Sequence, residues 1–127
     1  MTTFSVTARI MSFRYASRGI RLVVASQHNA WIHLAATLLV GATGLWAHLS
    51  GLEWCVIVLT TAAVWTAEAL NTAIEYVTDL ASPEFHVLAG KAKDAAAGAV
   101  LIAALGAVLV GCIIFLPRIF HLLQGPQ

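Results

Sequence analysis

Four acidic or amide side chains recur at helical spacing within one apolar stretch of the chain. They are Glu68, Asn71, Glu75 and Asp79. At about 100° per residue of α-helix, all four fall within an arc of roughly 80° on a single face. The stretch that carries them begins with the apolar run at residues 54–59. A charged side chain at the centre of a bilayer costs about 2.5–3.5 kcal/mol even on lenient insertion scales, so an unpaired row of such groups predicts a functional site.

The chemistry available to this row is that of a metal-bound phosphate. Carboxylate and amide oxygens are the ligands that Mg²⁺ prefers, usually as one or two carboxylates completed by substrate phosphates. Lys93 follows nearby in the sequence, and its ammonium is a point charge suited to a phosphate. The chain has neither a Walker-type glycine loop nor a kinase glycine-rich loop. If the chain is a phosphotransferase, it therefore belongs to neither common class.

A second function class also fits carboxylates within an apolar span. Such groups mark ion pathways, so the alternative is a small proton or cation translocator. The run Lys91-Ala92-Lys93-Asp94 favours the kinase, because a translocator has no need of a phosphate-binding segment. Nothing in the sequence interleaves aromatic and basic residues, so we expect no nucleic-acid partner.

Composition defines the elements that must position these groups. The chain has 127 residues, of which 60% are hydrophobic and 10% are charged. A spanning helix needs about 20 mostly apolar residues, and three segments qualify. We expect an all-α integral membrane protein, a single domain over residues 1–127, with transmembrane helices at 31–50, 54–80 and 95–117. The break at residues 81–83 contains Pro83, and a polar loop is expected to continue from there to Asp94.

Residues 5–26 combine an apolar stripe with flanking arginines. The apolar positions are Ile10, Phe13, Ile20 and Val24, and the arginines are Arg14, Arg18 and Arg21. This pattern is typical of an amphipathic surface helix lying at the membrane interface near anionic headgroups. A helix packed on its own protein is the alternative, which we weigh less because so little soluble partner surface is available.

Basic residues predict the orientation. Six lie before the first span or between the second and third, and only Arg118 lies on the other side. Because cytoplasmic segments carry the excess of Lys and Arg, we expect a multi-pass protein of the cell inner (plasma) membrane with a cytoplasmic N-terminus. Small residues recur every four positions in the last span, which suits close helix–helix contact. They are Ala95, Ala99, Ala103, Ala107 and Gly111.

The pattern Glu68-x-x-Asn71-Thr72-x-x-Glu75-x-x-x-Asp79, followed by Lys93-Asp94, resembles the prokaryotic diacylglycerol kinase family. These are small three-span membrane enzymes that include the undecaprenol kinases. The resemblance covers nearly the whole chain. It implies a homotrimer, embedded among membrane lipids, that transfers the γ-phosphate of ATP to a lipid alcohol at the cytoplasmic interface with the help of Mg²⁺.

The resemblance also implies roles for individual residues. Glu68 would be the general base on the lipid hydroxyl, Asn71 would shape the catalytic site, and Glu75 would be a metal ligand. The nucleotide would be bound by Tyr15, Arg18, Asp79, Lys93 and Asp94. The family pattern leads us to expect a second metal-binding glutamate just before the first span, where this chain has Gln27. A glutamine oxygen can coordinate a metal but brings no negative charge, so weaker metal binding is expected.

The lipid acceptor is not decided by the residues. The stretches at 52–54 (Leu-Glu-Trp) and 82–86 (Ser-Pro-Glu-Phe-His) look closer to the undecaprenol kinase branch. Undecaprenol is therefore the favoured acceptor, with diacylglycerol a close second.

Plainer interpretations exist for several of these residues. Asn71 alone is more often a helix–helix hydrogen bond than a catalytic group, and His33 is interpreted as an interfacial or packing residue and not a metal ligand. Asp94 is compatible with a simple N-cap, and Glu53 with a favourable helix start. Lys91 is compatible with a positive-inside charge alone. Glu68 and Glu75 are the pair that these interpretations explain worst.

Overall fold

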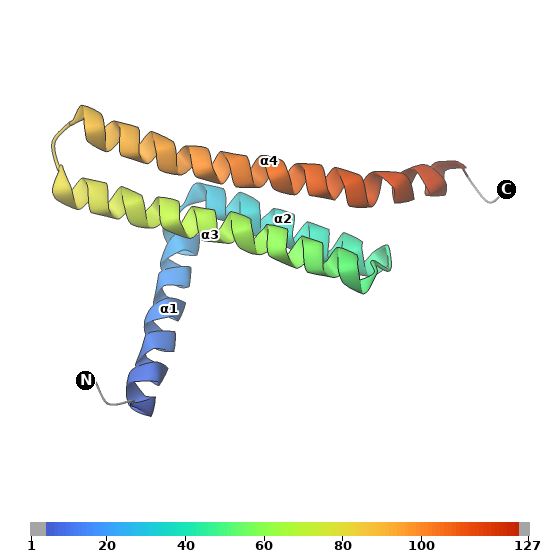
Figure 1. The fold of residues 1–127 in the computed structure, drawn as a ribbon, viewed down its shortest axis with the longest axis horizontal. Helices are drawn as coiled ribbons and strands as arrows, with labels where there is room; N and C mark the ends of the chain where they lie inside the picture. The colour runs from blue at the N-terminus through green and yellow to red at the C-terminus, as the bar shows by residue number, and fades with distance from the viewer. Residues whose placement is uncertain (1–4, 125–127) are drawn as a thin grey trace.

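The computed structural model describes residues 5–124, which form four α-helices joined by short connections (Figure 1). The helices are α1 (Val6–Ser26), α2 (His28–Trp46), α3 (Gly51–Ala81) and α4 (Val87–Gln124). Helices α2, α3 and α4 run side by side, whereas α1 leaves them at a steep angle (Figure 1). The described residues therefore have the expected all-helical fold, with one helix set apart from the other three.

Helix α1 corresponds closely to the helix expected at residues 5–26. Ser5 caps it, accepting a hydrogen bond from the Ala8 amide over 3.4 Å. Val23, near its C-terminal end, is buried, while large apolar side chains such as Ile10 and Phe13 are exposed. A helix that projects away from the rest of the chain with an exposed apolar face needs another apolar surface to cover it.

The corner between α2 and α3 is built from a capping box. The Ser50 hydroxyl accepts from the Glu53 amide over 3.4 Å, and Glu53 accepts from the Ser50 amide over 2.8 Å. Together these bonds satisfy two otherwise unpaired donors at the start of α3. Arg118 donates to both Glu53 carboxylate oxygens at 2.8 Å. The helix begins at Gly51, before the expected start at residue 54. Glu53 favours that start as expected, and its carboxylate also joins α3 to α4.

The polar segment between α3 and α4 is shorter than expected. Helix α3 ends at Ala81 as expected, but α4 begins at Val87, so the connection is residues 82–86. Lys93 and Asp94 therefore lie within a helix, and the N-cap interpretation of Asp94 is wrong. The physical reason is that the residues after Pro83 include no strong helix breaker. Leu, Ala and Lys are good helix formers, and a single glycine is tolerated. Helix α4 also continues through Pro117, beyond the expected end of the third span.

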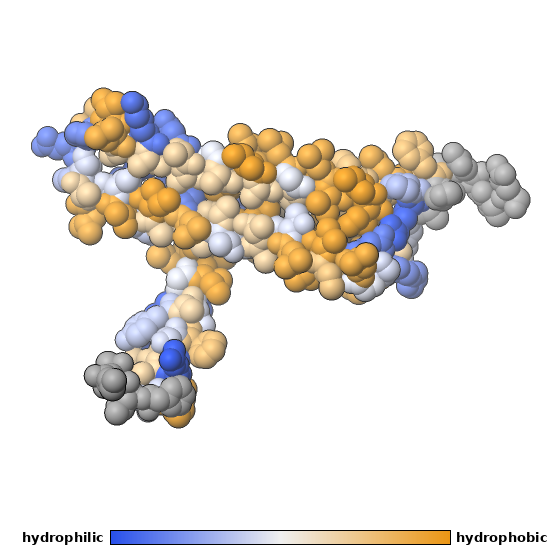
Figure 2. Space-filling view, in the orientation of Figure 1, coloured by the Kyte–Doolittle hydropathy of each residue, from blue (hydrophilic) through white to orange (hydrophobic). Residues whose placement is uncertain are grey.

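Two helices in the described part of the chain are long and apolar enough to cross a membrane, Gly51–Ala81 and Val87–Phe120. Helix α2, the counterpart of the expected first span, is not one of these two, and it carries His28, Asn29 and His33 in its N-terminal part. Hydrophilic residues gather at both ends of the α3–α4 pair, with hydrophobic surface between them (Figure 2). Many large apolar side chains are exposed on that surface, Leu59 and Leu101 among them. Such exposure is unfavourable in water and favourable in lipid.

Candidate active site

Glu68 is completely buried although it is a carboxylate. Its exposed fraction is 0%, and neither carboxylate oxygen has a hydrogen-bond partner among the described residues. The nearest complementary group is Nε2 of His33, which is 3.7 Å from Oε2 of Glu68 and is also buried without a partner. Buried polar groups without partners are rare because leaving each one unsatisfied costs roughly 1–3 kcal/mol. This pair is therefore the feature of the fold that most needs a bound ligand to explain it.

His33 is the functional candidate that sequence reasoning missed. A packing role alone does not account for its position, because α2 places its imidazole against α3, beside Glu68. Its ring meets Trp65 edge-on, with ring centroids 6.3 Å apart. The one available signal was the pair His33 and Thr37, two polar residues four positions apart in an apolar helix, which therefore lie on one face. Only the packing of that face against α3 identifies the partner of His33.

Glu75 lies two turns beyond Glu68 on the same face of α3 and is held by two side-chain amides. Gln27 donates from Nε2 to Oε2 over 2.8 Å, and Asn71 donates from Nδ2 to Oε1 over 3.1 Å. Gln27 lies at the junction of α1 and α2, where it caps both helices with an extended backbone. The structure thus brings Gln27 to Glu75, the residue with which it was expected to share a metal ion.

Asn71 lies between the two glutamates along α3 and contacts Glu75. It is 6% exposed, and its Oδ1 is buried without a partner. Asn71 also lines a cavity of about 440 Å³ between α3 and α4, together with small residues such as Ala96 and Ala99. An amide whose nitrogen is bound to Glu75 and whose oxygen is unpaired can accept a hydrogen bond or ligate a cation.

Asp79 and Lys93 form a second, more exposed group at the end of α3. Lys93 Nζ is 2.5 Å from Asp79 Oδ1, and the side chains are 38% and 64% exposed. Asp94 is exposed on α4, next to Lys93. The pair joins α3 to α4 near the segment that connects them, at one of the two ends where hydrophilic residues gather (Figure 2).

Tyr15 and Arg18 lie together on α1. The Arg18 guanidinium carbon is 5.9 Å from the centre of the Tyr15 ring, within cation–π range. Arg18 also borders a hollow of about 360 Å³ with Arg14, Ser17 and Arg21. Within residues 5–120, no hydrogen bond or ion pair joins this group to Glu75 or Lys93. The structure therefore divides the expected site residues into a buried row on α3, a polar pair at its end, and a basic group on α1.

The row on α3 changes from buried to exposed along the helix. Glu68 is 0% exposed and Asn71 6%, Glu75 is partly buried, and the Asp79 side chain is 64% exposed. A buried unpaired carboxylate suits proton transfer from a hydroxyl, because it has no competing hydrogen bond. The carboxylate and amide oxygens nearer the surface suit a divalent cation bound with phosphates. The order of the row, from buried to exposed, matches a reaction between an alcohol that arrives from apolar surroundings and a phosphate donor that arrives from the aqueous side.

The described residues contain no cluster of three or more His, Cys, Asp or Glu side chains that would hold a metal alone. The oxygens around Glu75 nevertheless suit magnesium. Its carboxylate lies between the side chains of Gln27 and Asn71, and the unpaired Oδ1 of Asn71 is nearby on the same helix turn. Such a set provides one carboxylate and two amide oxygens, and phosphates or water must supply the remaining ligands.

Comparison with known proteins assigns the chain to a family. Residues 14–115 match the family model of prokaryotic diacylglycerol kinase. The chain is 42% identical to an undecaprenol kinase of Bacillus subtilis over 108 residues, covering 85% of this chain and 88% of that protein. It is also 42% identical to a diacylglycerol kinase of Synechocystis sp. over 115 residues, covering 90% and 66%.

A third relative, a diacylglycerol kinase of Escherichia coli, is 33% identical over 119 residues, covering 88% of this chain and 92% of that protein. The family match includes the whole row on α3, Gln27 and the polar pair at the end of α3. With the resemblance in sequence confirmed in this way, the chain belongs to the prokaryotic diacylglycerol kinase family.

Proposed function

We propose that this chain is a membrane lipid kinase that transfers the γ-phosphate of ATP to a lipid alcohol at the cytoplasmic interface. The observation that carries the proposal is the row from Glu68 to Glu75, in which buried polar atoms without partners lie beside a carboxylate that two amides hold. Membership of a kinase family supports the same reaction. The relatives found are named kinases, and nothing supports the alternative of a proton or cation translocator.

Glu68 acts as the general base. The lipid hydroxyl enters beside its unpaired carboxylate and gives up its proton while the oxygen attacks the γ-phosphorus. General-base catalysis by a positioned carboxylate contributes about 10²–10⁴-fold in rate. Asn71, with one amide hydrogen on Glu75 and a free oxygen, shapes the space between the base and the phosphate.

Glu75, Gln27 and Asn71 would hold the magnesium ion that the family is expected to use. When bound, the ion neutralises charge on the phosphates and so favours their approach to the carboxylates. For Gln27 to contribute its oxygen, the amide must rotate from the orientation in which its nitrogen donates to Glu75. Asp79, Lys93 and Asp94 surround the nucleotide at the end of α3, and Tyr15 and Arg18 approach it from α1.

Helix α2 spans the membrane together with α3 and α4, which makes three spans in all, and the N-terminus is cytoplasmic. The direction of α1 supports this arrangement: because it leaves the other helices steeply, it lies along the surface when they cross the bilayer (Figure 1). The protein resides in the cell inner (plasma) membrane. It assembles as a homotrimer, because one chain offers few walls for a nucleotide and a lipid together and leaves exposed small residues such as Ala95 and Ala99 on α4.

Undecaprenol is the favoured acceptor and diacylglycerol the close second. The identity of 42% to both an undecaprenol kinase and a diacylglycerol kinase does not separate them. The test is ATP-dependent phosphorylation by the purified protein in detergent, with undecaprenol and diacylglycerol supplied separately. We expect both to be phosphorylated and undecaprenol to have the higher kcat/KM. No phosphate transfer to either lipid would overturn the proposed function, and a preference for diacylglycerol would overturn only the choice of acceptor.

A further inference from the structure

Two buried groups of opposite hydrogen-bonding character face each other across a gap. His33 Nε2 and Glu68 Oε2 are 3.7 Å apart, which is too long for a direct hydrogen bond. Both atoms, and the second Glu68 oxygen, are buried without a partner. An imidazole N–H is a donor and a carboxylate is an acceptor, so the gap lies between one of each.

A hydroxyl group satisfies both sides of this gap. Its oxygen can accept from the imidazole N–H and its hydrogen can be donated to the carboxylate. The two atoms are 3.7 Å apart. An oxygen about 2.8 Å from each of them would make two hydrogen bonds of ordinary length. A cation in the gap would satisfy Glu68 but not an N–H donor. The gap therefore fits an alcohol better than a metal ion.

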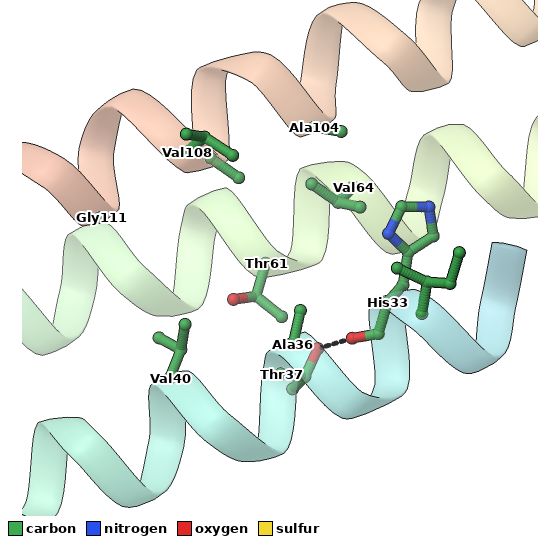
Figure 3. Close-up of a pocket in the computed structure, with 11 residues that line it drawn as sticks. His33, Ala36, Thr37, Val40, Thr61, Val64, Ala104, Val108 and Gly111 are labelled. Atoms are coloured by element: carbon green, nitrogen blue, oxygen red, sulfur yellow. Dashed lines mark hydrogen bonds between the residues drawn. The ribbon is translucent and has the colours of Figure 1, made fainter.

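The position of the imidazole is determined by its neighbours. Trp65 packs edge-on against it, and the Trp65 indole N–H donates to Thr37 Oγ1 over 3.1 Å. The Thr37 hydroxyl donates in turn to the His33 carbonyl over 2.7 Å, the bond drawn in Figure 3. This closed set of contacts between α2 and α3 holds the ring beside Glu68, as a residue that positions a substrate must be held.

The same imidazole borders an apolar groove. His33 lines a cavity of about 320 Å³ between α2, α3 and α4, along with Thr37, Val64 and Ala104 (Figure 3). His33 is the residue that the groove and the gap share, whereas Glu68 does not line the groove. A lipid alcohol is a molecule of matching character, since its chain is apolar and its end carries one hydroxyl.

We propose that His33 binds the hydroxyl oxygen of the lipid alcohol through its Nε2–H and so holds that hydroxyl against Glu68. This inference rests on the proposed function and adds a catalytic residue to it. In the reaction, the hydroxyl O–H bond breaks and the proton moves to a Glu68 oxygen. The oxygen forms a bond to the γ-phosphorus of ATP, and the bond from that phosphorus to the bridging oxygen breaks with its electron pair on ADP. His33 keeps its own proton throughout.

Two amide substitutions of His33 test this role. The amide nitrogen of His33→Gln reaches about as far along the side chain as Nε2, whereas that of His33→Asn stops short of it. Both side chains are polar, neutral at all relevant pH values and similar in their demands on folding. The control is His48→Asn, which removes a histidine at the far corner of α2 and α3, where a backbone φ of 49° is one that asparagine tolerates.

The measurement uses farnesol, a short lipid alcohol, and the hydrocarbon in which a methyl group replaces its CH₂OH group. The affinity of each compound is measured for the protein with a bound Mg-ATP analogue. The ratio of the two affinities reports the hydroxyl contacts alone. One hydrogen bond is worth about a five- to tenfold change in affinity. We expect His33→Asn to lower the ratio by that factor, and His33→Gln and His48→Asn to leave it within about twofold of the unsubstituted protein.

The outcomes separate this inference from the proposed function. An unchanged ratio in His33→Asn would mean that His33 only supports the packing of α2 against α3, because loss of packing weakens both ligands alike. An equal decrease in His33→Gln and His33→Asn would mean that the charge of the imidazole matters rather than its N–H, and would also overturn the inference. If the unsubstituted protein phosphorylates no lipid alcohol, the proposed function fails, whatever the ratios are.

Discussion

Gln27 and Glu75 are 48 positions apart, yet the Gln27 amide donates to the Glu75 carboxylate over 2.8 Å. The contact joins the start of α2 to the C-terminal half of α3 and depends on the extended backbone at Gln27, which separates α1 from α2. Because the family pattern leads us to expect a glutamate at this position, the amide replaces a negative charge by a hydrogen-bond donor. The site can therefore remain intact without a metal, where two carboxylates would repel each other.

Gln27→Glu tests this relationship. A second carboxylate beside Glu75 supplies charge to a cation, so the Mg²⁺ concentration that gives half-maximal kinase activity is expected to fall about tenfold. Without Mg²⁺ the two carboxylates repel, and the temperature of unfolding is expected to decrease. The matched control is His28→Glu, which adds the same charge at the next, exposed position. Equal Mg²⁺ dependence in Gln27→Glu and His28→Glu would show that Gln27 does not face the ion.

Glu68→Gln and Glu75→Gln separate the proposed base from the proposed metal ligand. Glu68→Gln keeps the shape but cannot take the proton, so turnover is expected to decrease at least about 10²-fold while Mg-nucleotide binding persists. Glu75→Gln is expected to weaken Mg-nucleotide binding, because no carboxylate remains in the set with Gln27 and Asn71. Turnover and Mg-nucleotide affinity are measured on both variants with the same lipid alcohol. An equal loss of nucleotide binding would mean that the two residues share one role.

Lys93→Met tests the proposed nucleotide site at the end of α3. Loss of a charge that faces phosphate is expected to lower ATP affinity about tenfold. Because the Lys93–Asp79 pair is exposed, its loss should change the free energy of unfolding by less than about 1 kcal/mol. Lys91→Met removes the same charge two residues earlier on α4, at an exposed position, and should leave ATP affinity unchanged. ATP affinities that fall equally in the two variants would point to general attraction by positive charge rather than to a site at Lys93.

Gly44→Ala tests the corner that joins α2 to α3. A Cβ atom on Gly44 would lie 2.9 Å from the Trp54 ring and 3.0 Å from a Leu49 methyl group, so one of them must move. Overpacking of this kind costs about 1–3 kcal/mol. Gly41→Ala is the control, because a Cβ atom there meets nothing within 4 Å. Thermal unfolding of both variants in detergent provides the comparison, and a Gly44→Ala protein as stable as Gly41→Ala would show that the corner rearranges freely.

Periodicity and composition were enough to establish the all-helical class, the helix at the N-terminus and the row on α3. Glu68, Asn71 and Glu75 share a helix, and the angle between residues of one helix follows from their spacing alone. The break before α4 was also visible, at Pro83. The length of the segment after it was not, because the charged residues at 91–94 suit a polar loop as well as a helix, although Leu, Ala and Lys are good helix formers. Propensity alone is a weak guide at such boundaries.

Contacts between different helices were decided by the tertiary structure alone. The sequence placed Glu68 on an apolar helix, but the packing of α2 against α3 set His33 beside it and left both without other partners. In the same way, Gln27 was recognisable only as a departure from the family pattern until the fold brought its amide to Glu75. The spacing of residues along a helix determines which of them share a face. Which residue of another helix meets that face depends on the rotation and register of the two helices, and these are set by many packing contacts acting together.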